Sequence, residues 1–114
     1  MKSISGLLVM TALSLTACAS VQPVPNHPNA IATIERYYRY HAWEEGGRCL
    51  VPDMTVTDTE VVENTPDRLV LNVRYYWKDR RTDSDTFGNT CNGFASRTFT
   101  LSQGQVVAMT GDHR

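Results

Sequence analysis

The sequence predicts an α+β protein in which one N-terminal helix packs on a four-stranded antiparallel meander. Two observations lead to this fold class. Between residues 29 and 45, apolar side chains recur every three to four positions, as in an amphipathic helix, whereas from Met54 onward they alternate with polar ones, as in half-buried strands. The chain of 114 residues is long enough for one domain.

The predicted helix runs from about Pro28 or Asn29 to Glu45. Proline suits a first helical turn, where its missing N–H is no loss, and Asn29 or Asn26 is a candidate N-cap. Gly46-Gly47 is a typical helix stop. By the i, i+3, i+4 rule, one face carries Ala30, Ile31, Ile34, Tyr38, His41 and Ala42. This aromatic band favours packing against a sheet.

The strands are predicted from alternation and from turn residues. The clearest spans Arg68 to Lys78, and its apolar face consists of Leu69, Leu71, Val73, Tyr75 and Trp77. The others are Met54 to Glu63, Asn92 to Ser102 and Gln105 to Thr110, with turns at Asn64-Thr65-Pro66-Asp67 and Gln103-Gly104. This architecture resembles the cystatin-like and NTF2-like folds, in which a helix lies in the hollow of a curved sheet.

The predicted sheet is wider than the predicted helix. Four strands about 4.8 Å apart make a face close to 19 Å wide, while a helix is about 10 to 12 Å across. The uncovered flank is therefore filled by large side chains such as Trp77, Tyr75 and Phe99, covered by another protein, or left as a pocket.

Two of the three cysteines are expected to form a disulfide. Cys18 belongs to the N-terminal segment, so Cys49 and Cys91 remain as a pair that would oxidise in an exported protein. Such a bond closes a loop of about 43 residues, which contributes about 4 kcal/mol in the chain-entropy model. The alternatives are two separate buried thiols or two metal ligands, although no C-x-x-C spacing is present.

The first 17 residues are predicted to be a signal peptide. Lys2 is followed by an apolar run from Ile4 to Leu15, which is too short to cross a bilayer. Leu15-Thr16-Ala17-Cys18 resembles the lipobox of bacterial lipoproteins. The resemblance implies a diacylglycerol on Cys18, the first residue of the mature chain, and Ala19-Ser20 after it implies the outer membrane. An ordinary secretory leader is the alternative, because Ala17-Cys18-Ala19 also fits the A-x-A pattern.

Residues 18–28 are predicted to be an extended tether that contains Pro23, Pro25 and Pro28. In polyproline II geometry it would hold the domain, residues 29–114, about 30 Å from its anchor. The domain would then work near the membrane surface.

The candidate interaction surface consists of Arg74, Tyr76 and Lys78, which alternation places on the open face of the central strand. Cations beside an aromatic ring suit anionic glycans, lipid headgroups or an acidic protein surface. The alternative is an ordinary solvated strand face that discourages aggregation.

Other candidate site residues are expected to have ordinary structural roles. Asp58 and Glu60 share a strand face and could act as paired carboxylates, but they are expected to decorate the solvated side. Asp83, Asp85 and Gly88 mimic a calcium loop, yet Phe94 stands where the bidentate Glu is required. The histidines at positions 27, 41 and 113 have no metal-site spacing. We therefore expect no metal, no cofactor and no catalytic residues.

The expected function follows from these observations. A formal net charge of -1, without a basic patch, disfavours a nucleic-acid partner. We expect a non-catalytic structural or protein-interaction module, anchored through acylated Cys18, facing the periplasm and bound to an envelope protein. The alternatives are a binder of a small apolar ligand or lipid between helix and sheet, and, by fold analogy alone, a protease-inhibitor-type module.

Overall fold

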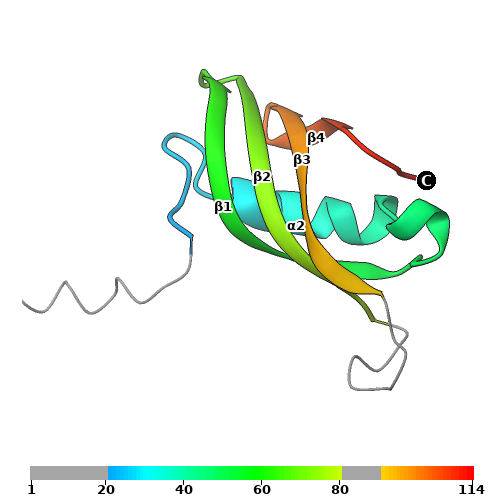
Figure 1. The fold of residues 1–114 in the computed structure, drawn as a ribbon. Coiled ribbons are helices and arrows are strands. Elements are labelled where there is room, and N and C mark those ends of the chain that lie inside the picture. The colour runs from blue at the N-terminus through cyan, green and yellow to red at the C-terminus, as the bar shows by residue number, and fades with distance from the viewer. Residues whose placement is uncertain (1–20, 81–90) are drawn as a thin grey trace, which may run out of the picture.

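The computed structural model describes residues 21–80 and 91–114, in which one α-helix lies against one antiparallel sheet (Figure 1). The strands follow one another in the order β1-β2-β3-β4, so the predicted α+β meander is confirmed. The elements are α2 (Ala30–His41), the 3-10 turn η3 (Glu45–Gly47), β1 (Pro52–Asn64), β2 (Arg68–Asp79), β3 (Asn92–Ser102) and β4 (Gln105–Met109). The signal peptide, Cys18 and the loop with Asp83, Asp85 and Gly88 lie outside the described residues.

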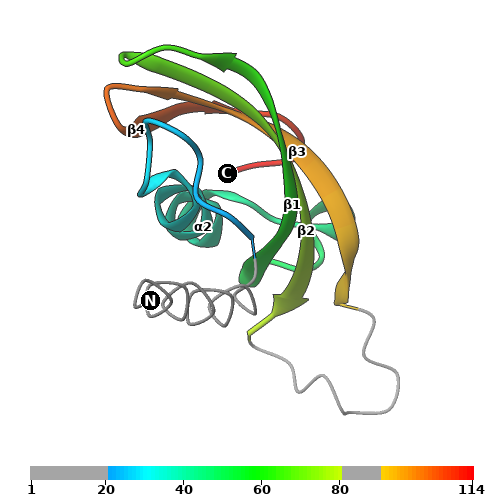
Figure 2. The same ribbon diagram turned by 90° about the vertical axis from the view of Figure 1, so that its left-hand side faces the viewer.

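The sheet curves around α2, which lies on its concave side (Figure 2). On β2 the predicted alternation is confirmed, because the inward side chains of Leu69, Leu71, Val73, Tyr75 and Trp77 are all buried. From the helix, Ala30, Ile34 and Tyr38 are buried against them. Large side chains fill the flank beside the helix, since Tyr75 and Phe99 are 0% exposed and Trp77 is 3% exposed.

The helix ends earlier than predicted, at His41 instead of Glu45. Ala42 closes the last turn with an N–H to Tyr38 O bond of 3.0 Å and is itself extended, with φ −105° and ψ 155°. The extended chain then pairs Ala42 with His113 near the C-terminus. This exit carries Glu44 away from the helix axis and into the protein.

Gly46 and Gly47 build a turn instead of capping the helix. The backbone of Glu44 pairs with that of Cys49, through bonds of 2.9 and 3.1 Å, on either side of η3. Both glycines lie at positive φ, 62° and 92°, which explains why glycine is needed there. The prediction that these glycines end the helix is therefore wrong, because the helix has ended at His41 and the glycines form this later turn.

The segment predicted to be an extended tether packs on the domain from Val21 onward. Val24 is buried at 4% exposure, and Val21 is packed against the same core. The Asn64 side chain donates to Pro25 O at 2.9 Å, and His27 Nε2 lies 2.8 Å from Thr65 O. The segment from Val21 onward is therefore bound to the β1–β2 turn, and the burial of its valines stabilises this position.

The edge strand β1 is irregular at two places and covered by the helix at a third. Register shifts between Val56 and Asp58 and between Val61 and Glu63 mark two irregularities in its pairing with β2. Bulges of this kind twist an edge strand and disfavour pairing with another chain. Nearer α2, Glu35 accepts the Val56 N–H at 3.1 Å, so the helix itself covers that part of the edge.

Candidate functional site

The most strongly connected polar group of the domain is a buried network of Tyr38, Glu44, Tyr75 and Arg97. Glu44 Oε2 accepts hydrogen bonds from the Tyr38 hydroxyl at 2.6 Å, the Tyr75 hydroxyl at 2.7 Å and Arg97 Nη2 at 3.1 Å. The side chains of Arg97 and Glu44 are only 5% and 12% exposed. The buried network thus joins the helix, the segment after it and two central strands.

Arg97 uses each nitrogen of its guanidinium. Nε donates to the Tyr75 hydroxyl at 2.7 Å. Nη1 donates to the carbonyl oxygens of Thr110 and Asp112 at 2.7 and 3.0 Å, and Nη2 donates to Trp43 O at 3.0 Å as well as to Glu44. These bonds occupy the five donors that a guanidinium has. Arg97 therefore fastens the C-terminal residues and the segment after α2 to β3.

Burial fixes the protonation states within this network. Burial is the largest cause that raises the pKa of both Tyr38 and Tyr75 above the ordinary 10.0, and hydrogen bonding to Glu44 raises it further. For Arg97, burial lowers the pKa, but the neighbouring Tyr75 and Glu44 together raise it by more, so the net shift of the pKa is upward. The tyrosines stay neutral and the arginine stays charged, which suits a structural network.

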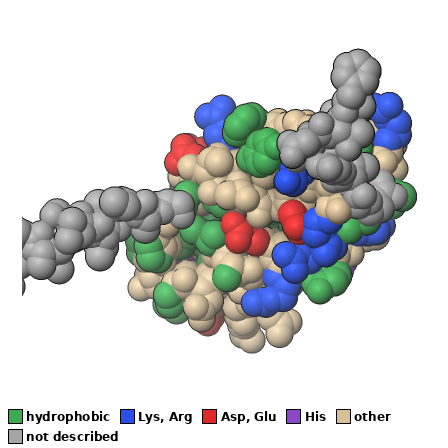
Figure 3. Space-filling model, turned by 90° about the horizontal axis from the view of Figure 1, so that it is seen from below, with side chains coloured by type: hydrophobic (Ala, Val, Ile, Leu, Met, Phe, Trp, Pro, Cys, Tyr) green, Lys and Arg blue, Asp and Glu red, His purple; other side chains and the backbone are tan. Residues whose placement is uncertain are grey.

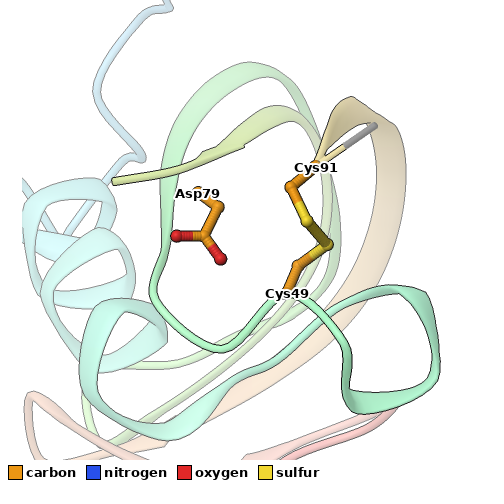
Figure 4. Close-up of side chains that lie close together, drawn as sticks. All are labelled: Cys49, Asp79 and Cys91. Atoms are coloured by element: carbon orange, nitrogen blue, oxygen red, sulfur yellow. A yellow bond between two sulfur atoms is a disulfide. The ribbon is translucent and has the colours of Figure 1, made fainter. Parts of the chain in front are cut away.

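The predicted disulfide between Cys49 and Cys91 is present, with the two Cα atoms 5.7 Å apart. The disulfide joins the turn after η3 to Cys91, the residue directly before β3. Asp79 lies beside it, completely buried (Figure 4), and its ligand oxygen and the two sulfurs fall within 4.8 Å of one another. Because the sulfurs are bonded to each other, neither is a thiolate that could bind a metal.

The predicted interaction surface lies on the face of the sheet that points away from α2. Arg74, Tyr76 and Lys78 alternate with the buried side chains of β2, as predicted. The structure adds Phe94, which pairs with Tyr76 across β2 and β3 and is 76% exposed. The two rings lie 5.2 Å apart between centroids, tilted by 59°. Tyr76 and Phe94 are called the aromatic pair below.

Next to the aromatic pair, an open groove of about 650 Å³ crosses the strands. The floor of the groove is formed by Thr59, Val73 and Arg97, which are register partners across β1, β2 and β3. The side chains of Val73 and Arg97 are buried on the opposite face of the sheet. This groove is called the outer trough. One of its walls consists of Asp58, Arg74 and Ser96, and the other consists of Glu60, Asn72 and Thr98. Thr110 also lines it.

One wall of the outer trough is held by hydrogen bonds that cross three strands. Thr98 donates to Asn72 Oδ1 at 2.7 Å, and Asn72 Nδ2 donates to Glu60 Oε1 at 3.1 Å. On the other wall, the Arg74 guanidinium has no ion pair or hydrogen bond with any residue in 21–80 or 91–114. The outer trough thus combines a preorganised polar wall with a cation that has no partner in the part of the chain that the structure describes.

The remaining candidates take different positions. Asp58 and Glu60, predicted to share a strand face, do so and belong to opposite walls of the outer trough. His41 stacks on Tyr37, with the ring centroids 3.9 Å apart, and His27 and His113 lie in other parts of the chain. Within 21–80 and 91–114, the histidines form no group with other metal-ligating side chains.

Charged side chains are mixed in sign over the surface. The face in Figure 3 carries basic groups with acidic groups between them. Asp53, for example, lies 2.9 Å from Arg39 Nε and 3.4 Å from Arg80 Nε. Asp53 also raises the pKa of the Arg39 guanidinium by accepting its hydrogen bond.

Sequence reasoning missed Arg97 and Phe94, although alternation on β3 contained a signal for both. Phe99 and Leu101 point inward, so Arg97 falls on the apolar face, where an arginine requires a buried partner. Phe94 falls on the polar face, where a large aromatic residue is unusual. Each is an exception to the pattern that predicts its strand.

Comparison with known proteins yields no match: no protein-family model fits the chain, and neither a curated protein nor a solved structure is significantly similar to it.

Proposed function

We propose that the chain is a bacterial lipoprotein whose domain binds a component of the cell envelope without catalysing a reaction. Cys18 becomes the acylated first residue after the leader is removed, and the domain faces the periplasm from the outer membrane. The outer trough and the aromatic pair form the binding face. The aromatic pair, in which Phe94 is 76% exposed and Tyr76 is partly buried, is the observation that carries this proposal, because two adjoining rings at a solvated strand face have no role in the core.

The anchor and the packed N-terminal segment together support a position close to the membrane. Val21 is already packed against the core, so only three residue steps separate it from Cys18. A fully extended chain spans at most about 3.6 Å per residue, so the domain begins within about 11 Å of the anchor. This distance is about a third of the reach expected for a free tether, and it restricts the domain to components at the membrane surface.

The buried network supports a binding role over a catalytic one. Glu44 and Arg97 are the most buried ion pair among the described residues. All five donors of Arg97 are occupied within the protein, and Oε2 of Glu44 accepts three hydrogen bonds from Tyr38, Tyr75 and Arg97. A general acid or base must instead reach a substrate. Their arrangement is that of a structural ion pair.

The anchor is tested by labelling growing cells with radioactive palmitate and comparing the parent chain with Cys18→Ser. We expect label in the parent protein and none in the variant, which should also lose its membrane fraction. Two or more acyl chains are needed for stable anchoring, so the fractionation is expected to be nearly complete. An unlabelled parent protein would show that the leader is an ordinary secretory one.

The binding face is tested by photocrosslinking in cells with p-benzoylphenylalanine placed at Phe94. Tyr40 is the matched control position, because it is 61% exposed and lies on α2, on the other side of the sheet. We expect an adduct from Phe94 that Arg74→Glu abolishes, and no such adduct from Tyr40. Equal adducts from both positions would refute the assignment of the binding face.

A further inference from the structure

We propose that the outer trough and the aromatic pair bind a neutral glycan chain, one rich in hydroxyl and amide groups. The inference rests on the proposed function in one respect, that this face is the binding face. It adds the chemistry of the ligand, which is derived from the side chains that the sheet register brings together.

The aromatic pair provides a platform for a sugar ring. A pyranose has an apolar face of C–H groups, which packs against aromatic rings as other apolar surfaces do. Phe94 offers a ring that is 76% exposed, and the neighbouring Tyr76 ring, 5.2 Å away and tilted by 59°, widens the platform into a shallow angle. The Phe94 ring is also held in place by this contact, so little side-chain freedom is lost on binding.

The walls of the outer trough provide the hydrogen bonds that sugar hydroxyls require. Asn72 and Thr98 are held in one orientation by their bonds to each other and to Glu60, so their remaining donor and acceptor positions are preorganised. Ser96 and Arg74 stand opposite, on the second wall. Amide, hydroxyl, carboxylate and guanidinium groups together can bind hydroxyls as donors and as acceptors.

The charge of the outer trough selects a neutral ligand over an anionic one. From the sequence, the surface of Arg74, Tyr76 and Lys78 suits anionic glycans, lipid headgroups or an acidic protein surface. The register instead places Asp58 directly across from Arg74, and Glu60 stands on the facing wall. Two carboxylates and one guanidinium repel a polyanion more than they attract it.

The dimensions fit a chain of more than one sugar. Tyr76 lies three residues along β2 from Val73, which is at the floor of the outer trough, and this separation is about 10 Å at the rise of a strand. A single ring on the aromatic pair would not reach the Asn72 wall, whereas linked rings fill both places. The groove of about 650 Å³ is open at the surface, so a polymer can pass through it without threading.

The test titrates the full-length protein, purified in detergent, with chitotetraose, a neutral tetramer of N-acetylglucosamine. Binding is measured by calorimetry, and heparin tetrasaccharide serves as the anionic comparison. Phe94→Ala and Asn72→Ala remove the platform and the wall, and Tyr40→Ala is the control, another exposed aromatic residue, which lies on the other side of the sheet. Far-UV circular dichroism establishes that each variant is folded.

We expect chitotetraose to bind more tightly than heparin tetrasaccharide. Phe94→Ala should weaken binding roughly three- to tenfold, as expected for one aromatic contact, and Asn72→Ala by about threefold or more. Tyr40→Ala should leave the affinity within twofold. Absence of chitotetraose binding, tighter binding of the heparin oligosaccharide, or equal effects of Phe94→Ala and Tyr40→Ala would each overturn the proposal.

The glycan proposal and the proposed function can fail independently of each other. A protein adduct from Phe94 in cells, with no chitotetraose binding in vitro, would overturn the glycan proposal and leave the envelope-binding module in place. Chitotetraose binding by a chain that takes up no palmitate would overturn the anchor and retain the glycan site.

Discussion

Replacing Arg97 with methionine tests whether the buried network holds the domain together. Methionine fills much of the same space but has no donors, so the substitution leaves the carbonyl oxygens of Trp43, Thr110 and Asp112 and one side of Glu44 without their partner. The change acts on a side chain that is 5% exposed. Water therefore cannot replace the lost bonds without opening the structure.

The expected loss of unfolding free energy depends on the hydrogen bonds that Glu44 keeps in Arg97→Met. Glu44 keeps the hydroxyls of Tyr38 and Tyr75, at 2.6 and 2.7 Å, so its charge is only partly uncompensated. Breaking one side of a buried ion pair costs about 3–5 kcal/mol, and we expect about 4 kcal/mol here. Summing five separate charge-assisted bonds would exceed the whole stability of a typical domain, so the sum is not the right estimate.

The assay is urea unfolding followed by far-UV circular dichroism, with the disulfide intact. At an m value of about 1.5 kcal/mol/M, a loss of 4 kcal/mol lowers the midpoint by about 2.7 M urea. Arg97→Lys retains the charge but cannot reach all the same acceptors, so it should fall between the parent and Arg97→Met. In a double-mutant cycle, Arg97→Met and Glu44→Gln should couple by about 1–3 kcal/mol.

A loss below about 1 kcal/mol for Arg97→Met would refute the reasoning, because it would mean that solvent reaches these groups in the folded protein. A coupling of zero with Glu44→Gln would refute the ion pair specifically. Arg97→Lys keeps the test decisive if Arg97→Met does not fold.

Two further predictions concern the same region. Gly111→Ala should destabilise the domain by about 1–3 kcal/mol more than Gly104→Ala. Both glycines have positive φ, 90° and 83°, so the backbone strain is similar. A Cβ at Gly111 would lie 2.5 Å from Arg97 Nη1, whereas a Cβ at Gly104 would meet no atom within 4 Å. Arg97 cannot swing aside cheaply because its donors are occupied. Above pH 10, the unfolding free energy should fall by about 1.4 kcal/mol per pH unit for each of Tyr38 and Tyr75, because unfolding lets the hydroxyls ionise while the fold raises their pKa and keeps them protonated. Tyr75→Phe should reduce this slope by about half.

Urea unfolding at a series of pH values measures both effects. Equal stabilities of Gly111→Ala and Gly104→Ala would contradict the close approach to Arg97. For the tyrosines, stability that does not change between pH 10 and 11, or a slope that Tyr75→Phe leaves unaltered, would contradict their burial beside Glu44. Below pH 10 these two groups are protonated in both states and contribute no pH dependence.

The strands could be predicted because their pattern is local. Leu69, Leu71, Val73, Tyr75 and Trp77 alternate with polar residues, and a pleated strand turns every second side chain to the same face. The outward position of Tyr76 follows from the same period. The disulfide could be predicted from the count of cysteines, since assigning Cys18 to the N-terminal segment leaves Cys49 and Cys91 as the remaining pair.

The end of the helix and the form of the N-terminal segment could not be predicted in this way. Gly46-Gly47 is a typical helix stop, but the helix ends earlier, where the chain turns to contacts that are distant in sequence. Ala42 pairs with His113, and two partners of Glu44 lie 31 and 53 residues further along the chain. Likewise, the prolines before Pro28 indicate an extended segment, whereas Val24 is buried because a core is present for it to join.

Spacing along the chain is enough to predict the fold class, the order of the strands, the face that each side chain of β2 takes and the cysteine pair. The contact of Arg97 with Glu44 in the core, the position of Asp58 opposite Arg74 and the contact of Phe94 with Tyr76 are visible only in the folded arrangement. The physical reason is that strand register and chain reversal bring distant residues together. Charge balance and aromatic platforms are properties of those pairs, and no single stretch of sequence contains them.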